Sequence, residues 1–242
     1  MAGGLLVEGD SVVYPPAAAA FFLERATALG ASVHLGERVS SFAHGTARLA
    51  DGTILHASTL INAAGQDAAR LTPGIQVRPR KGHLVITDRY PGMIRHQLVE
   101  LGYLKSAHLV TADSVAFNIQ PRATGQLLIG SSRQYNVENN QAEPSIVSQM
   151  LQRAFKYLPA LDSLSAIRVW TGFRPATPDN LPLIGPWSED PTLSVAAGHE
   201  GLGITTSLGT AKLICAQVNG AAVPIPQEPY LPSRQMIAED HG

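Results

Sequence analysis

Two hydrophobic patterns alternate along the first third of the chain. Residues 12–30 (VVYPPAAAAFFLERATALG) predict a short strand ending at Tyr14 and then a helix, because prolines favour the first helical turn and glycine favours the end. The helical residues expected to face a core are Phe22, Ala26 and Leu29. Residues 31–42 alternate like a half-buried strand, residues 47–57 predict a hairpin, and residues 58–65 (STLINAAG) predict a buried strand with a small-residue end.

The middle of the chain carries strand-like patterns as far as residue 130. Short apolar segments separated by turn residues favour an antiparallel sheet. These segments are residues 83–88, 96–100, 107–111, 114–120 and 126–130. An amphipathic helix is then predicted over residues 144–158. Its apolar face consists of Ile146, Met150, Leu151, Ala154 and Leu158.

The last third returns to strands that lead into loops and a helix. Residues 164–175 predict a strand, residues 193–198 (LSVAAG) a second one, and residues 203–218 a helix. The helical residues expected to point inward are Ile204, Leu208, Ala211 and Ile214. An α/β pattern at both ends of the chain, around an antiparallel middle, predicts two parts of different character, with the first and last segments joined in one domain.

Composition narrows the class of protein. Hydrophobic residues make up 45% of the 242 residues and charged residues 15%, which is typical of a packed globular chain. A net charge of -1 does not favour binding to nucleic acid. No apolar run is long enough to predict a transmembrane helix. One cysteine and a start without a signal-peptide pattern predict a cytoplasmic protein without a disulfide framework.

Two glycine- and proline-rich segments carry candidate chemistry. In GHEGLGIT, residues 198–205, a strand ends, glycines permit close approach, and a helix begins with outward-facing amides. This pattern suits an anionic or carbonyl ligand, and it equally suits an ordinary turn. In WTGFRPATPDNLPLIG, residues 170–185, prolines stiffen the chain around Arg174. Its guanidinium suits either a bidentate grip on a ligand carboxylate or an ion pair with a nearby acid such as Asp179.

Other catalytic patterns are missing from the sequence. None of the eight histidines pairs at metal-ligand spacing, and neither an HExxH nor a GxSxG motif occurs. We therefore expect no metal site and assign no catalytic residue. Tyr103 and Tyr135 are candidates for contact with a substrate.

Taken in order, these segments resemble the D-amino-acid-oxidase-like family of FAD-dependent oxidoreductases. The resemblance runs from about residue 4 to about residue 220. It is carried by residues 12–42, STLINAAG, RPRKGHLVI, FNIQPRATGQLLIGSSR, GFRPATPDNLPLIG and AAGHEGLGIT.

The resemblance implies FAD as cofactor and oxidation of an amino acid or related amine by hydride transfer to flavin N5. It assigns Arg174 to the substrate carboxylate. It assigns to the cofactor Val39, Ala64, Gly65, Gly198, His199, Glu200, Gly201, Leu202, Gly203, Ile204 and Thr205. Glu200 is a departure, because small residues are common there in the family.

A second departure is the missing GxGxxG phosphate loop with which the family begins. We therefore expect a C-terminal part, a misplaced gene start, or a separate polypeptide that supplies this segment. The predicted fold is α/β plus α+β: an incomplete Rossmann-like FAD-binding domain (residues 1–72 and 186–242) with an inserted antiparallel-sheet substrate domain (residues 73–185). Two other functions stay open: a non-catalytic scaffold or binding subunit, and a flavoenzyme acting on a 2-hydroxy acid or secondary amine.

Overall fold

The chain folds into two compact units, seen in a computed structural model that describes residues 3–102 and 113–237. One unit consists of residues 1–31 and 80–173, and the other of residues 32–79 and 174–242. Tyr103 and the strand predicted over residues 107–111 lie outside the described residues. The assignment of residues 1–72 and 186–242 to flavin binding, and of residues 73–185 to substrate binding, stays a prediction.

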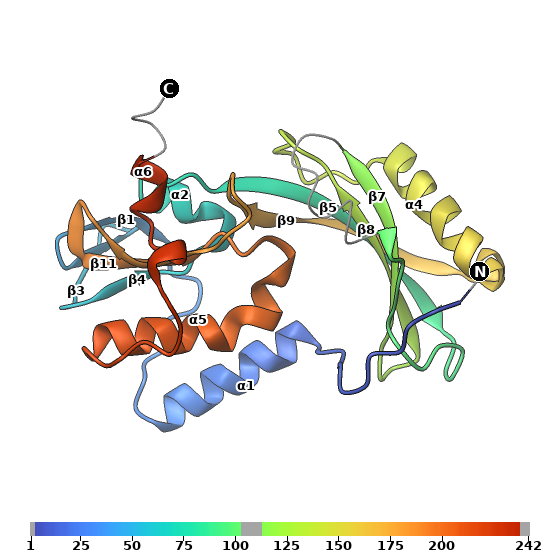
Figure 1. Cartoon of the computed structure of the whole chain (residues 1–242), viewed down its shortest axis with the longest axis horizontal. Coiled ribbons are helices and arrows are strands. Elements are labelled where there is room, and N and C mark those ends of the chain that lie inside the picture. The colour runs from blue at the N-terminus through green and yellow to red at the C-terminus, as the bar shows by residue number, and fades with distance from the viewer. Residues whose placement is uncertain (1–2, 103–112, 238–242) are drawn as a thin grey trace. The chain divides into compact units, whose positions relative to one another are not determined.

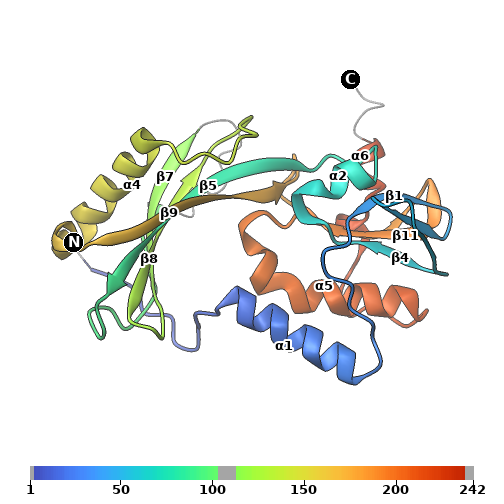
Figure 2. The same cartoon turned by 180° about the vertical axis from the view of Figure 1, so that it is seen from behind.

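The first unit is an antiparallel sheet covered by a helix. The strand order is β6–β7–β8–β5–β9. The strands are β5 (Arg78–Arg89), β6 (Leu98–Val99), β7 (Ser114–Pro121), β8 (Gln126–Arg133) and β9 (Ala166–Ala176). Helix α4 (Pro144–Tyr157) packs against β7 and β8 on one face of this sheet (Figures 1 and 2).

Apolar residues of the sheet and of α4 form the core of the first unit. Met150 and Ala154 of α4 are fully buried, and a short 3-10 helix (Pro159–Ser163) adds Leu161. The strand residues in this core are Val85, Phe117, Ile119, Leu127 and Ile129. The predicted antiparallel sheet and the amphipathic helix are therefore confirmed.

Helix α1 (Pro15–Ala28) forms where the sequence predicts it, but the predicted buried face is wrong. Phe22 is 52% exposed and Leu29 is 85% exposed, and no residue of the helix is buried. Residues 17–23 are apolar around the whole helix, so their spacing does not select a face. The predicted strand at residues 12–14 is also absent, because the described strands include none there.

The second unit has two three-stranded sheets. One is antiparallel, with β1 (Val39–Ala43), β2 (Thr46–Leu49) and β3 (Ile54–His56), which confirms the predicted hairpin. The other has the order β10–β11–β4, with β10 (Leu183–Trp187), β11 (Asp190–Ala197) and β4 (Leu60–Asn62). The strand predicted over residues 31–42 is shorter in the structure and begins only at Val39.

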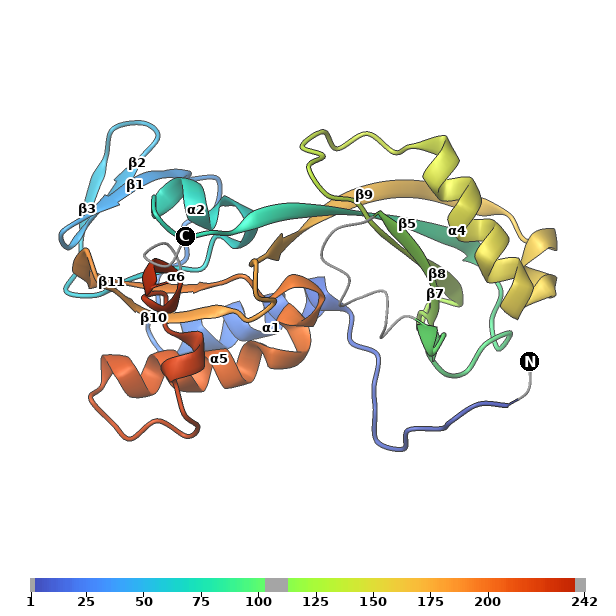
Figure 3. The same cartoon turned by 45° about the horizontal axis from the view of Figure 1, so that its top comes forward.

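Helix α5 (Gly203–Val218) packs on β10 and β11, while the hairpin sheet lies on the other side of them (Figure 3). The core between the sheets includes Leu60, Leu183, Trp187, Leu193 and Val195. The short elements of this unit are a 3-10 helix (Gly65–Asp67), α2 (Ala68–Leu71), further 3-10 helices (Glu200–Leu202 and Glu228–Tyr230) and α6 (Arg234–Ile237). Among the described helices, none has the length and apolarity needed to cross a membrane.

The predicted inward face of α5 is largely wrong. Ile214 is buried as expected, but Ile204 is 54% exposed and Leu208 is 60% exposed, and Ala211 is also exposed. The buried residues are Leu213, Ile214 and Ala216. The helix is apolar on several sides, so contact with β10, and not the periodicity, selects the buried face.

A buried polar network joins β5 to β8 and to the start of α4. The Lys81 ammonium is fully buried and donates to the Glu143 carboxylate at 2.9 Å. His83 is also fully buried; its Nδ1 lies 2.9 Å from the Ser132 hydroxyl, and its Nε2 accepts the Glu143 backbone N–H at 3.0 Å. Burial, followed by the Lys81 charge, lowers the pKa of His83, although the Glu143 carboxylate opposes this. The native state therefore holds His83 neutral.

This network predicts a pH dependence of stability. The pKa of His83 lies below its ordinary value of 6.5, so the unfolded chain takes up the proton first as the pH falls. The free energy of unfolding should therefore decrease as the pH falls through 6.5. We expect His83→Gln to flatten this decrease in urea unfolding between about pH 7.5 and about pH 5. The control His56→Gln, at an exposed position of β3, should keep the wild-type slope. Equal slopes for His83→Gln and wild type would contradict the assignment.

Candidate functional site

The segments predicted to contact a cofactor follow two adjacent parallel strands. β4 pairs with β11 in parallel, with Val195 opposite Asn62. Residues 63–65 come directly after β4, and Gly198 comes directly after β11. The carboxyl ends of parallel strands meet at one edge of a sheet, so the two segments lie at the same edge. Ligands of open α/β sheets bind outside this edge.

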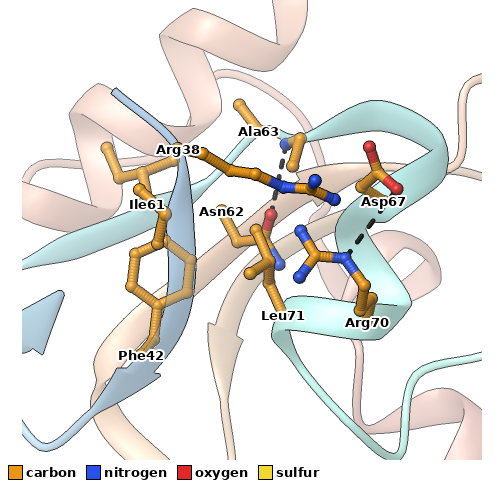
Figure 4. A pocket seen from close by; sticks show the side chains of 10 residues that line it. Arg38, Phe42, Ile61, Asn62, Ala63, Asp67, Arg70 and Leu71 are labelled. Carbon is orange, nitrogen blue, oxygen red and sulfur yellow. Dashed lines mark hydrogen bonds and ion pairs between the residues drawn. The ribbon is translucent and has the colours of Figure 1, made fainter. Parts of the chain in front are cut away.

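A pocket opens beside the end of β4 (Figure 4). Its volume is about 310 Å³, and we call it the β4 pocket. Its lining consists of Arg38, Val39, Phe42, Ile61, Asn62, Ala63, Ala64, Asp67, Arg70 and Leu71. Two of the predicted cofactor residues, Val39 and Ala64, therefore line one pocket. A Cβ atom built on Gly65 would meet nothing within 4 Å, so the chain leaves open space beside the strand end.

Asn62 fixes the backbone of the β4 pocket. Its side chain is buried; Nδ2 donates to the Ala68 carbonyl at 2.9 Å and to the Thr72 hydroxyl at 2.8 Å. Its Oδ1 accepts the Ala64 N–H at 3.1 Å. These three bonds satisfy a polar group that would be costly to bury unpaired, and they hold the turn after β4 in one shape. The sequence analysis did not select Asn62, although it lies within INAAG.

Two arginines at the β4 pocket were also not predicted. Figure 4 shows the guanidinium groups of Arg38 and Arg70 over its centre. Arg70 pairs with Asp67 at 3.9 Å, measured from Nε to Oδ1. Arg38 comes just before β1 and Arg70 lies on α2, so no local sequence pattern connects them. With Asp67, which also lines the pocket, the two arginines leave a net charge of +1 beside apolar walls.

The loop after β11 packs tightly against the segment that follows Arg174. A Cβ atom on Gly198 would lie 2.6 Å from Cγ2 of Thr177, and the φ angle of Gly198 is +84°, so glycine is needed there. One residue further, His199 forms an isolated antiparallel bridge with Ala176. Nε2 of His199 lies 2.8 Å from the Thr210 hydroxyl of α5, and burial lowers the pKa of this imidazole. The two C-terminal sequence motifs are thus packed together.

This packing brings Arg174 beside Glu200. Nε of Arg174 lies 3.9 Å from Oε1 of Glu200, and the side chains are 20% and 14% exposed. Glu200 has a φ angle of +48°, a left-handed conformation that is uncommon outside glycine and clusters at functional sites. Within the described residues, Arg174 therefore pairs with an acid of the predicted cofactor loop.

The sequence analysis named Asp179 as an example of an acid that could pair with Arg174. In the structure, Asp179 pairs with Arg234 instead. The Asp179 carboxylate accepts two hydrogen bonds from the Arg234 guanidinium, at 2.7 and 3.1 Å. Burial raises the pKa of Asp179, but the bonds from Arg234 and from the Leu181 backbone outweigh it and the pKa lies below the ordinary value. Proximity in sequence suggested Asp179, whereas the tail of the chain supplies its partner.

The rest of the predicted loop forms the start of α5. Residues 200–202 form a single 3-10 turn, and α5 begins at Gly203, so Gly201 and Thr205 lie on either side of the helix start. The first amides of a helix have no partner within it and are available to a ligand. Leu202 and Ile204 are more than half exposed at this end. In the described part of the chain, no group of three His, Cys, Asp or Glu residues suits a metal ion.

Comparison with known proteins defines the class to which this fold and site belong. The chain belongs to the family described as FAD dependent oxidoreductase, whose model matches residues 1–217. FAD is the cofactor of this family, and the predicted family resemblance is confirmed. The predicted fold class, a mixed α/β chain with antiparallel sheets of this family, is also confirmed by the solved structures below.

The chain is similar to several individual members of this family. The chain is 31% identical over 238 residues to the hydrogen cyanide synthase subunit HcnC of Pseudomonas aeruginosa, covering 93% of this chain and 53% of that protein. It is 28% identical to the glycine oxidase of Geobacillus kaustophilus, covering 88% of this chain and 55% of that protein. The crystal structure of that oxidase superposes with a TM-score of 0.77 at 25% identity, covering 90% of this chain and 58% of that one.

An L-proline dehydrogenase from P. horikoshii shares the fold, with a TM-score of 0.80 at 21% identity, covering 93% of this chain and 60% of that one. The chain therefore spans little more than half the length of these relatives.

The close packing at Gly198 predicts a costly substitution. Gly198→Ala places a Cβ atom against Thr177 and forces a non-glycine residue to a φ of +84°. We expect a loss of about 1–3 kcal/mol in the free energy of unfolding. Gly203→Ala is the matched control, because its Cβ would meet its nearest atom at 3.5 Å and it begins a helix.

Chemical denaturation of the two variants and of wild type decides the question. Gly203→Ala should be neutral or stabilising, since alanine favours helices over glycine. Adding Thr177→Ser, which removes Cγ2, should restore part of the stability lost in Gly198→Ala. The same stability for both alanine variants would contradict the packing argument.

Proposed function

We propose that this chain is the part of an FAD-dependent oxidoreductase that holds the adenine side of FAD in the β4 pocket and the substrate carboxylate at Arg174. The substrate is an amino acid or related small amine. One observation carries the proposal: the ends of β4 and β11 lie at one edge of a sheet, and Arg174 contacts the loop that follows β11. Similarity to glycine oxidase supports glycine as the first substrate to test.

The residues of the β4 pocket fit this part of FAD. Apolar Val39, Phe42 and Leu71 suit a flat ring, while small Ala63 and Ala64 let a ligand approach the backbone. Arg38 and Arg70 suit the negative charge of a pyrophosphate. When bound, FAD supplies the redox chemistry, since its flavin ring accepts a hydride from the substrate.

Arg174 binds and orients the substrate in this account. It lies near the end of β9, where Pro175 restricts the backbone, and its planar guanidinium suits two parallel hydrogen bonds to a carboxylate. The start of α5 places helix amides at the same loop, and their partial positive charge favours an electron-rich group there. No residue is assigned to remove a proton.

A second polypeptide that completes the cofactor site is the partner we propose. β4 has a described neighbour on one side, β11, and Ile61 is 46% exposed. A strand edge of this kind is suited to pairing with another segment. The relative HcnC is named as a subunit of hydrogen cyanide synthase, which supports such an assembly. A cytoplasmic location stays a prediction.

The ion pair between Arg174 and Glu200 is also the observation that favours the alternative function, a non-catalytic scaffold. If Arg174 serves only to hold Glu200, it has a structural role and the chain needs no substrate. Purified protein from the native source then shows no flavin absorbance. The alternatives of a 2-hydroxy acid and of a secondary amine such as proline change the substrate and leave the β4 pocket as proposed.

FAD titration tests the β4 pocket. The sequence has no GxGxxG motif, so we expect the chain alone to bind FAD weakly and saturably, as measured by quenching of flavin fluorescence. Ala64→Leu fills the pocket and should weaken binding by at least about tenfold, a loss of about 1.4 kcal/mol. Ala19→Leu makes the same change on exposed α1 and should have no effect. Stoichiometric tight binding by wild type would show that the GxGxxG motif is not needed, and equal binding by Ala64→Leu would show that the pocket is wrongly assigned.

Arg174→Lys tests the substrate role in an assembly with bound flavin. Lysine keeps the charge but loses the planar fork, and a charge-assisted hydrogen bond contributes about 1.5–3 kcal/mol. We expect kcat/KM for the amino acid to fall by about one to two orders of magnitude while the flavin absorbance per protein stays unchanged.

A melting curve on the same preparation separates the two roles of Arg174. The substrate role predicts an almost unchanged Tm, with Arg174→Ala losing more activity than Arg174→Lys. A lower Tm with loss of flavin and an unchanged KM would mean that Arg174 is structural, and the substrate assignment would be wrong.

A further inference from the structure

The contact between Arg174 and Glu200 places a fixed negative charge beside the proposed carboxylate site. Nε of Arg174 and Oε1 of Glu200 lie 3.9 Å apart, which makes the two groups an ion pair. Both side chains are largely shielded from water, so their charges are screened less than on an open surface. A second negative group that approaches Arg174 therefore also meets the charge of Glu200.

Glu200 is held at this place by its own loop. Its other oxygen, Oε2, accepts the backbone N–H of Gly201, and its backbone keeps a left-handed φ of +48°. Its neighbour His199 is fixed by the bridge to Ala176 and by the contact with Thr210. A carboxylate anchored in this way stays near Arg174 when a ligand enters.

We propose that Glu200 determines specificity: it makes the Arg174 site prefer zwitterionic amino acids over carboxylates that carry no ammonium group, such as 2-hydroxy acids. The inference rests on the proposed function, in which Arg174 binds the substrate carboxylate. A zwitterion brings a positive group that offsets the charge of Glu200, whereas a 2-hydroxy acid brings a hydroxyl that does not. Specificity of this kind comes from a repulsive element that penalises the wrong ligand.

The size of the effect follows from Coulomb's law. Two unit charges about 4 Å apart interact weakly in water and about four times more strongly near a protein surface. A ligand carboxylate bound to the guanidinium would lie further from Glu200 than Arg174 does and would keep part of its hydration, so we expect an effect near the weaker limit. We expect about a tenfold preference for the zwitterion.

Glycine and glycolate are the matched probes, because they share the carboxylate and differ in the ammonium group. Each is titrated into the purified chain in excess FAD, with binding followed by NMR of the arginine side-chain N–H signals. The Arg174 signal is assigned from its loss in Arg174→Lys. The dissociation constants of both probes are compared in wild type and in Glu200→Gln. The control Glu189→Gln removes the same charge at an exposed position of the β10–β11 hairpin.

Wild type and Glu189→Gln should bind glycine about tenfold more tightly than glycolate. Glu200→Gln, whose amide oxygen can still accept the Gly201 N–H, should bind glycolate about tenfold more tightly than wild type and should lose most of the preference. If Glu200→Gln is unstable, Glu200→Asn replaces it, because asparagine tolerates the left-handed conformation. Glu200→Asn should show the same gain in glycolate binding.

Two results would overturn the proposal, and they are distinguishable. An unchanged glycine-to-glycolate ratio in Glu200→Gln, with both probes weakened in Arg174→Lys, would reject the role of Glu200 and leave the substrate role of Arg174 intact. If neither probe binds, or if Arg174→Lys leaves the binding of both probes unchanged, the carboxylate site and the role of Glu200 are both rejected.

Discussion

The contact between Thr177 and the bare Cα of Gly198 is the constraint on which the site depends. It lets the segment after β9 lie against the loop after β11, where Ala176 and His199 form a bridge. Any side chain at residue 198 would separate these two segments. Because they touch, Arg174 contacts Glu200, and a cation from one motif and an anion from the other form one electrostatic unit.

The parallel pairing of β4 with β11 is the second organising feature. It places the small residues after β4 and the glycine loop after β11 at one edge of the sheet, as in other α/β folds that bind ligands there. Asn62 keeps the first of these turns in shape through three hydrogen bonds. The proposed cofactor site therefore draws on segments more than 130 residues apart, which one sheet brings together.

Sequence reasoning succeeds here where the signal is local. Proline pairs, glycine ends and regular spacing correctly predict α1, α4 and α5, and the turn residues predict the hairpins. It fails on the buried faces of α1 and α5, because apolar residues lie on several sides of each helix and their spacing does not single out one face.

Long-range contacts account for the other differences. The partner of Asp179 comes from Arg234 in the C-terminal tail, and the proximity of Arg38 and Arg70 depends on how β1 meets α2. Glu200 stood out in the sequence as an unusual residue, but its contact with Arg174 depends on the close approach at Gly198. Neither spacing nor composition contains that information.

The central claim is that Arg174 and Glu200 act on the same ligand as one unit. A double-mutant cycle measures this coupling: the free-energy change caused by Glu200→Gln on glycolate binding is determined with arginine and with lysine at position 174. The account predicts a clearly smaller effect of Glu200→Gln in the lysine background, because the ligand carboxylate is no longer held beside Glu200. The same effect in both backgrounds would mean that the two residues act independently, and it would contradict the account.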